Sequence, residues 1–376
     1  MTDDHIALAS RWANRRSTVH KPPNPLSGAH SFTINLVSIR KDIRAEVSVR
    51  KTSTKAETNS SERSAIKTRR ALRDRERRVR RPRQGELQVL RSEKLSAVPW
   101  LLHGFSTRMG GVTQEYGGNQ LNLGMTAEDS RENVLKNRGR FMRAIGAINA
   151  KGKAWHVNTV NQRHTGIVHR VASGKAFGSL QKGGKSIVGD GLITNVRGVL
   201  LSVRVADCYP VLLADVKRKA IGIFHAGWRG TTQRIVEKGV GDMRRYFGSR
   251  PQDILAVVGP GIGSCCYEIG EEVENEFDSQ FAYSKDLFSD VFDSWSLHTR
   301  YPLLFLNQRA PGHGEPALSR HLDLAEANRR QLLDAGIPAE NIEVMGLCTA
   351  CQTDRFFSYR KEHVTGRMMA VIGIRR

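Results

Sequence analysis

Cys208 and His225 lie in two apolar, β-branched segments separated by the charged turn Asp215–Lys219. This pattern predicts a β-hairpin, and folding it about Lys217 places Cys208 within one residue of the position opposite His225. Side chains that face each other across a β-ladder have Cβ atoms about 4.5–5.5 Å apart. Because zinc bonds a thiolate at about 2.3 Å and an imidazole at about 2.0 Å, one ion could bridge the two side chains.

The same two residues allow a second interpretation, in which Cys208 is a buried thiol and His225 a hydrogen-bonded histidine of the core. Free cysteine is among the residues most often buried, so the spacing alone leaves both open. Pro210 interrupts the first apolar segment and indicates an edge strand or a bulge. Bulges are common beside active sites.

The elements that must position these residues mix strands and helices without a regular βαβ order. The fold class is therefore predicted to be α+β, a single domain of mixed β-sheets with flanking helices. Helices are expected over Glu128–Gly146 (capped by Asp129 or Ser130), Thr231–Phe247, Glu271–Trp295 and His321–Gly336, and strands over Pro99–Ser106, Ile254–Ile262 and Met369–Ile374.

Composition indicates a cytoplasmic globular protein. Of the 376 residues 39% are hydrophobic, and no run approaches the roughly 18 apolar residues of a membrane span. The start of the sequence lacks the features of a signal peptide. An odd number of cysteines, five, indicates reduced thiols.

The first quarter of the chain is strongly basic. Residues 1–94 contain 23 Lys and Arg against 10 Asp and Glu, in a chain of net charge +22. This composition is typical of disorder, so we expect residues 1–86 to form a basic extension and residues 87–376 the folded domain. Residues 64–83 could form a basic helix that binds nucleic acid. A solvated tail, or sequence upstream of the true start, is the favoured interpretation, and a transit peptide is a lesser alternative.

Several separated blocks occur together from Leu87 onward. They are HGFSTRMGGV with LNLG (103–124), NQRH (161–164), ADCYPVLLAD (206–215), HAGWRGT (225–231), VGPGIGSCCYEIG (258–270), HLDLAEANRRQL (321–332) and CTACQTDRFFSYRKEHVTGRM (348–368). This combination closely resembles the multi-copper polyphenol oxidoreductase "laccase domain" family, whose members are also described as purine nucleoside phosphorylases or peptidoglycan editing factors. Residues 1–86 match nothing in that family.

The resemblance implies one metal site with two histidines and one cysteine, here His164, Cys208 and His225. Zinc is the expected metal, and copper is possible because it competes well for nitrogen and sulfur ligands. The sequence has Arg163 and Thr165 where the family usually has a small apolar residue and glycine. Neither departure removes a ligand.

The resemblance also implies an enzyme of purine nucleosides and phosphate. It would phosphorolyse adenosine, inosine and S-methyl-5′-thioadenosine, and deaminate adenosine. Three ligands leave a fourth zinc position open, as in catalytic sites. Alternatives are an amidase that hydrolyses UDP-muramyl-serine, a copper-dependent polyphenol oxidase, and a nucleic-acid-binding protein that uses the basic extension.

Arginine suits phosphate because its planar, permanently charged group binds two oxygens at once. Arg108, Arg229 and Arg360 stand in the matching blocks and are predicted substrate contacts, although each could form a structural ion pair instead. Asn122 is expected either to contact substrate or to fix its loop.

Two further residues are predicted to support the metal ligands. Asp207 precedes Cys208 and could accept a hydrogen bond from a ligand histidine, or bond to backbone instead. Gln162 stands in the block of His164 and is expected to play a similar part.

Cys348 and Cys351 form a C-x-x-C motif without a second such motif to complete four ligands. The adjacent pair Cys265 and Cys266 is expected to present both sulfurs poorly to one ion. We therefore interpret all four as structural or incidental. The oligomeric state is not indicated by the sequence.

Overall fold

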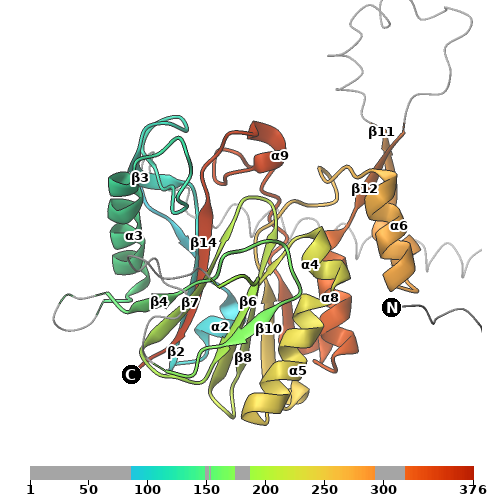
Figure 1. Cartoon of the computed structure of the whole chain (residues 1–376), viewed down its shortest axis with the longest axis horizontal. Coiled ribbons are helices and arrows are strands. Elements are labelled where there is room, and N and C mark those ends of the chain that lie inside the picture. Colours follow the sequence, from blue (N-terminus) through green and yellow to red (C-terminus); the bar gives the residue numbers. More distant parts are fainter. Residues whose placement is uncertain (1–85, 149–151, 153, 174–186, 293–317) are drawn as a thin grey trace, which may run out of the picture. The chain divides into compact units, whose positions relative to one another are not determined.

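The computed structural model describes residues 86–148, 152, 154–173, 187–292 and 318–376 (Figure 1). These residues form the α+β fold of mixed sheets and flanking helices that the sequence predicts. The predicted extension, including residues 64–83, lies outside the described residues apart from residue 86.

Two β-sheets form the centre of the fold. Their strand orders are β1-β2-β14-β7-β4 and β13-β10-β8-β9-β6-β5, and β11 with β12 forms a separate pair. The strands are β1 (Val89–Leu90), β2 (Leu101–Ser106), β3 (Met109–Thr113), β4 (His156–Asn158), β5 (Val168–Arg170), β6 (Gly191–Thr194), β7 (Val199–Val205), β8 (Tyr209–Asp215), β9 (Ala220–Ala226), β10 (Ile254–Val258), β11 (Phe288–Phe292), β12 (Leu318–Leu322), β13 (Ile342–Val344) and β14 (Met368–Ile374).

Helix α3 covers the outer face of the five-stranded sheet, and α5 and α8 cover the outer face of the six-stranded sheet (Figure 1). The helices are α2 (Glu93–Ser96), α3 (Arg131–Ile145), α4 (Trp228–Thr232), α5 (Ile235–Phe247), α6 (Glu271–Gln280), α8 (Leu324–Asp334) and α9 (Tyr359–Glu362). The hydroxyl of Ser130 caps α3, as one of the two predicted caps. The helix predicted over Glu271–Trp295 is wrong from Phe281 to Phe292, because the chain turns after Phe281 and continues as β11. Residues 293–295 lie outside the described residues.

Strands buried on both faces divide the core into three clusters. In β8, Leu212 packs toward the five-stranded sheet, whereas Val211 packs with α5 and α8 on the other side. In β14, Ala370 lies between the two sheets and Val371 packs with α3. Successive side chains of a strand point to opposite faces, so the fold has four layers: α3, the two sheets, and the helices α5 and α8.

The predicted hairpin is confirmed for β8 and β9, with Pro210 opposite His225 and Asp215 opposite Ala220. The first apolar segment, however, contains two strands in different sheets, since β7 ends at Val205 and β8 begins at Tyr209. Asp207, between them, has a φ of 90°. Pro210 lies on a central strand of its sheet and not at an edge. A proline is acceptable at this position because it is the second residue of β8, where a strand can lack a backbone N–H donor at least cost.

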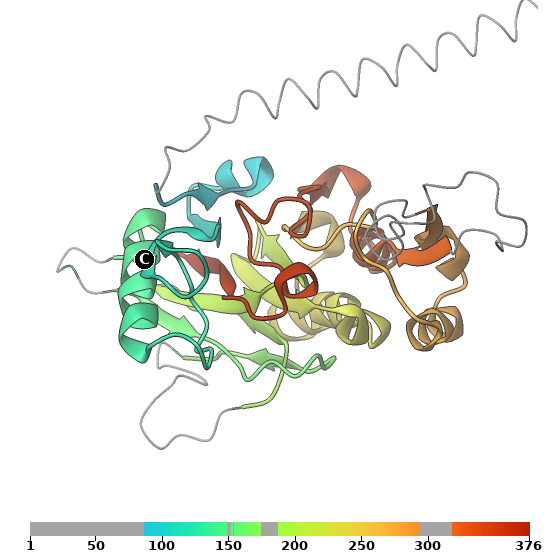
Figure 2. The same cartoon turned by 90° about the horizontal axis from the view of Figure 1, so that it is seen from above.

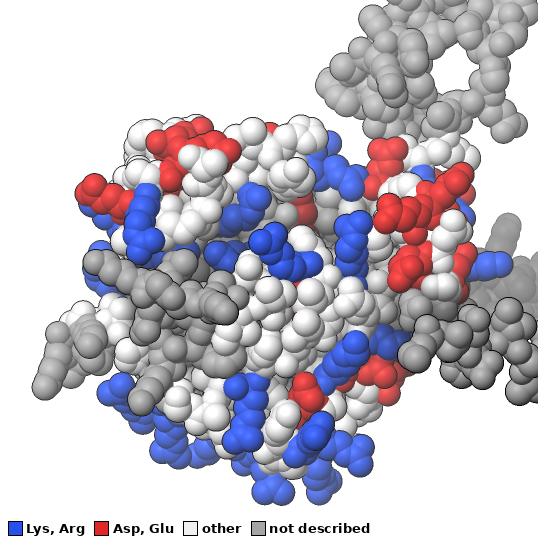
Figure 3. Space-filling view, in the orientation of Figure 1, with Lys and Arg blue, Asp and Glu red and all other residues white. Residues whose placement is uncertain are grey.

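Helix α9 and the loops beside it lie above the ends of the central strands (Figures 1 and 2). On the face shown in Figure 3, Lys and Arg side chains gather in the upper middle, between an acidic patch at the upper left and another over α6. Within the described part of the chain, no helix is both long enough and apolar enough to cross a membrane.

Candidate metal and ligand site

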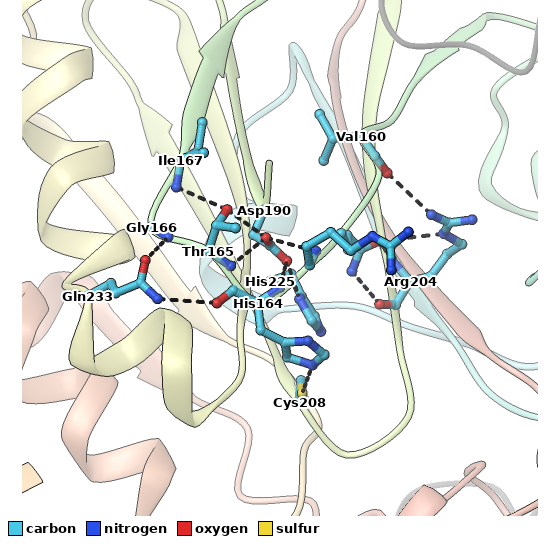
Figure 4. Close-up of polar contacts among 12 residues, drawn as sticks. Val160, His164, Thr165, Gly166, Ile167, Asp190, Arg204, Cys208, His225 and Gln233 are labelled. Atoms are coloured by element: carbon cyan, nitrogen blue, oxygen red, sulfur yellow. Dashed lines mark hydrogen bonds and ion pairs between the residues drawn. The ribbon is translucent and has the colours of Figure 1, made fainter. Parts of the chain in front are cut away.

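The ends of two adjacent strands and one loop bring His164, Cys208 and His225 together (Figure 4). Cys208 directly precedes β8, and His225 is the second-last residue of β9. Because Pro210 pairs with His225, Cys208 lies two residues along on the same side of the ladder. His164 comes from the loop between β4 and β5 and has a left-handed backbone, with a φ of 59°.

The three side chains have the spacing of ligands to one ion. Their candidate ligand atoms all lie within 4.8 Å of one another, and the His164 Nε2 is 3.7 Å from the Cys208 Sγ. Tetrahedral zinc with bonds of about 2.0 and 2.3 Å places its nitrogen and sulfur ligands about 3.5 Å apart. The observed distance therefore needs little adjustment.

Asp190, which the sequence analysis missed, organises two of these residues (Figure 4). Its Oδ1 lies 2.8 Å from the His225 Nδ1, which leaves the Nε2 to face Cys208. The backbone N–H of His164 donates to the same oxygen at 3.1 Å, and Thr165 donates to Oδ2 through its N–H and hydroxyl. One buried carboxylate thus fixes both the ring of His225 and the loop of His164.

The charges of these groups support one another. Burial acts to raise the pKa of Asp190, but hydrogen bonds from His225 and Thr165 lower it to about 2. Burial likewise opposes ionisation of Cys208, yet the charge of His225 and hydrogen bonds from both histidines lower the pKa of the thiol. The site therefore favours a thiolate, which is the form that binds metals.

The absence of a side chain at Gly227 leaves room for a bound group. A Cβ atom there would lie 2.8 Å from the Cys208 Sγ and 2.9 Å from the His164 Cδ2. Two imidazoles and a thiolate are the donors that zinc and copper prefer, whereas calcium and magnesium prefer oxygen. The residues present therefore fit the metal implied by the sequence resemblance.

The three side chains line a pocket of about 770 Å³. The rest of its wall includes Ile262 and Tyr267 from the loop after β10, and Tyr359 and Arg360 from α9. Arg204 at the end of β7 and Arg367 before β14 also line it. The volume falls in the range of small-molecule sites.

The pocket holds arginines without acidic partners. No ion pair between described residues involves Arg204, Arg360 or Arg367. Burial and the charge of Arg367 lower the pKa of Arg204, whose guanidinium donates to the Val160 carbonyl. Two like charges held together in this way favour an anionic ligand.

The structure places Arg108 and Asn122 outside the lining of the pocket. The Arg108 guanidinium pairs with Glu362 at 2.8 Å and stacks over Phe357. Asn122 is fully buried and bonds to both Gly124 and the backbone N–H of Arg367. Arg108 therefore takes the structural alternative, and Asn122 fixes its loop.

The other two predicted arginines differ from each other. Arg229 does not line the pocket; its exposed side chain packs on Trp228 and lies 3.4 Å from Glu272. Arg360 does line the pocket, where its guanidinium donates to the Glu268 carbonyl and lies over the ring of Tyr267.

No hydrogen bond between described residues joins the Asp207 side chain to His164 or His225. Its carboxylate accepts from the Thr349 hydroxyl and from the backbone N–H of Arg360, both at 2.7 Å. Gln162 lines the pocket, but its amide bonds to the backbone of Arg204. The hydrogen bond to a site histidine that was expected of Asp207 is made by Asp190 instead. The sequence signal that could have indicated Asp190 is an acidic residue directly before the buried strand β6.

Comparison with known proteins identifies the family of this chain. Residues 102–375 match the family described as multi-copper polyphenol oxidoreductase laccase. The chain belongs to this family. Among described residues, His164, Cys208 and His225 form the one candidate metal cluster that contains histidine.

Three relatives illustrate the similarity. A purine nucleoside phosphorylase of Deinococcus radiodurans is 39% identical over 77% of this chain and 94% of its own length. Adenosine deaminase RL5, from an unknown prokaryotic organism, is 34% identical over 46% of this chain and 56% of its own. The crystal structure of the hypothetical protein YfiH of Bacillus licheniformis superposes with a TM-score of 0.63 at 30% identity, covering 78% of this chain and 98% of that one.

Proposed function

We propose that this protein is a metal-dependent purine nucleoside enzyme that phosphorolyses adenosine, inosine and S-methyl-5′-thioadenosine and also deaminates adenosine. The observation that carries the proposal is one pocket lined both by the His164–Cys208–His225 cluster and by arginines that form no ion pair with a described residue. Relatives named purine nucleoside phosphorylase and adenosine deaminase support it.

Phosphorolysis needs a phosphate beside the ribose. A phosphate oxygen bonds to the C1′ atom, the bond from C1′ to the purine nitrogen breaks with its electron pair, and the base leaves and takes up a proton. Arg204 and Arg367 are suited to bind this phosphate, because arginine binds phosphate oxygens in pairs and keeps its charge when buried. Their mutual repulsion is relieved when the anion binds.

The purine base has an aromatic surface to bind against. Tyr359 lines the pocket with 55% of its surface exposed, and Tyr267 lies on the opposite loop with its ring under Arg360. A base that stacks on an aromatic side chain gains about 1–3 kcal/mol. We therefore assign the base to the tyrosine side of the pocket.

His164, Cys208 and His225 would hold a zinc ion in this pocket, and copper fits the same donors. When bound, the metal supplies Lewis-acid chemistry at neutral pH. Asp190 keeps the His225 ring in position for this role. Deamination exchanges the C6 amino group of adenosine for an oxygen from water and releases ammonia.

The test uses full-length protein purified without added metal. We expect adenosine to give adenine and ribose 1-phosphate only when phosphate is present, and inosine in either condition. Cys208→Ala should lose its metal and all of these activities. Full turnover by metal-free Cys208→Ala would contradict the proposal.

Two parallel assays separate the alternatives. Hydrolysis of UDP-muramyl-serine with no reaction of adenosine would identify an amidase instead. Oxidation of a phenol that requires copper, with no phosphorolysis in the zinc form, would identify an oxidase. Because both alternatives would use the same three side chains, the number of metal ions per chain does not distinguish them, whereas the substrate that reacts does.

A further inference from the structure

Four cysteines from two distant parts of the chain meet at one point away from the pocket. Cys265 and Cys266 lie on the loop after β10, and Cys348 and Cys351 on the loop after β13. All four sulfurs lie within 4.8 Å of one another. None of them lines the pocket described above.

The adjacent cysteines both reach the cluster, contrary to the expectation from sequence. The Cys351 Sγ lies 3.3 Å from the Cys265 Sγ and 3.4 Å from the Cys266 Sγ. A turn over 264–266, closed by the bond from the Cys266 N–H to the Gly263 carbonyl, bends the backbone so that both sulfurs point to Cys351. In an extended chain adjacent side chains point to opposite sides, and this turn removes that obstacle.

The backbone holds the two loops in register. Gly261 and Cys348 form an isolated parallel bridge, with bonds from the Gly261 N–H to the Leu347 carbonyl and from the Thr349 N–H to the Gly261 carbonyl. The backbone N–H of Gly263 donates to the Cys348 Sγ at 3.2 Å. Hydrogen bonds of this kind orient the sulfur ligands of metal sites.

We propose that Cys265, Cys266, Cys348 and Cys351 bind a second zinc ion in a closed, four-sulfur site. A zinc tetrahedron with bonds of about 2.3 Å has sulfur–sulfur edges of about 3.8 Å. The Cys351 sulfur lies slightly closer than this to two of its partners, at 3.3 and 3.4 Å, and all four sulfurs lie within 4.8 Å of one another. Four protein ligands leave no open position, so the ion is structural and not catalytic.

A disulfide explains the cluster less well. A disulfide joins two sulfurs at about 2.05 Å, whereas Cys351 is almost equally close to two different cysteines. The convergence of all four sulfurs requires a centre that bonds to each. Zinc binds four thiolates readily, and the separate C-x-x-C and C-C pairs each supply two.

The zinc ion would join two walls of the pocket. The first loop continues to Tyr267, and the second leads through Thr349 to Arg360. Asp207 connects them further, since its carbonyl accepts from the Ile262 N–H and its carboxylate from Thr349 and Arg360. The second ion thus positions pocket residues without contacting a ligand.

Metal content tests this inference independently of catalysis. We expect two zinc ions per chain in the full-length protein, one in Cys351→Ser, one in Cys208→Ser and none in the double variant. Ser264→Ala is a matched control, because this residue of the same loop contributes its carbonyl to His321 and no sulfur. It should keep both ions.

A second measurement covers the case in which Cys351→Ser does not fold. In the unsubstituted protein, a thiol reagent should modify the four cysteines slowly until a chelator removes zinc, and all five cysteines of the chain should react after denaturation. One zinc per chain that Cys351→Ser does not reduce, iron in place of zinc, or only three reactive thiols after denaturation would each overturn the proposal.

Discussion

The Oδ1 of Asp190 lies 2.8 Å from the Nδ1 of His225 and also accepts the backbone N–H of His164. These contacts fix which ring nitrogen of His225 is free and where His164 stands. Partners of this kind typically change metal affinity 10- to 100-fold when they are removed. Asp190 is therefore as much a part of the candidate metal site as the ligands themselves.

Replacing Asp190 by Asn keeps its size and removes its charge. We expect zinc affinity to fall by about 10- to 100-fold, measured by competition with a coloured chelator. Asp207→Asn is the matched control, because Asp207 bonds to Thr349 and Arg360 and to neither histidine. Equal losses in the two variants would show that Asp190 has no special connection to the metal.

Gly227→Ala tests whether the space beside the ligands is needed. The new Cβ atom would lie 2.8 Å from the Cys208 Sγ, and overpacking of this kind costs about 1–3 kcal/mol. Metal binding should weaken by about 5- to 150-fold. Gly241→Ala, in α5 with open space around it, should bind metal normally. An unchanged metal content and affinity in Gly227→Ala would refute the expected crowding.

The hairpin of β8 and β9 could be predicted from the sequence, because a charged turn between two apolar segments limits the strand pairing to nearly one register. It could not reveal that β7 and β8 belong to different sheets. Both strands are buried on both faces, so the apolar pattern continues from one to the next without alternation. The change of sheet occurs at Asp207, whose positive φ leaves no mark in hydrophobicity.

The residues around the candidate metal site were harder to predict than the meeting of His164, Cys208 and His225. Asp190 is 35 residues from His225 along the chain, and only the pairing of β6 with β9 brings them together. Arg204 belongs to a strand whose other residues are all apolar except Ser202, and nothing local distinguishes it from Arg108 or Arg229. The structural arginines pair with a carboxylate, and the arginines that line the pocket form no ion pair with a described residue. The sequence does not show this difference.

Arg204→Met should raise the KM for phosphate by tenfold or more, since it removes a charged hydrogen-bonding group worth about 1.5–3 kcal/mol. The nucleoside KM and the rate of deamination should change less, because deamination uses no phosphate. Arg229→Met is the control, since the structure places it outside the lining of the pocket. If Arg229→Met raises the phosphate KM and Arg204→Met does not, the anion site is elsewhere.

Tyr359→Ala should lower kcat/KM for adenosine by about 5- to 150-fold, the equivalent of the 1–3 kcal/mol that one stacked base contributes. Tyr359→Phe keeps the ring and should remain close to the unsubstituted protein. The comparison is made at saturating phosphate, with metal content measured in each variant. A phenylalanine variant as impaired as the alanine variant would assign the effect to the hydroxyl and not to stacking.

His103 gives the fold a pH dependence separate from the pocket. It is 2% exposed, and the backbone N–H of Ser92 donates to its Nε2 at 3.0 Å. Burial and the charge of Arg91 lower its pKa from 6.5 to about 4. The folded protein therefore holds His103 neutral, while the unfolded chain binds a proton as the pH falls below about 6.5.

The stability that depends on neutral His103 is complete above pH 6.5 and is lost as the pH falls toward 4. The shift corresponds to about 3 kcal/mol in the free energy of unfolding. His103→Gln retains an acceptor for the Ser92 N–H but cannot titrate in this range. Denaturant unfolding at pH 7 and pH 4 should show a loss about 3 kcal/mol larger in the unsubstituted protein than in His103→Gln. Parallel losses in the two proteins would mean that other groups determine the acid sensitivity.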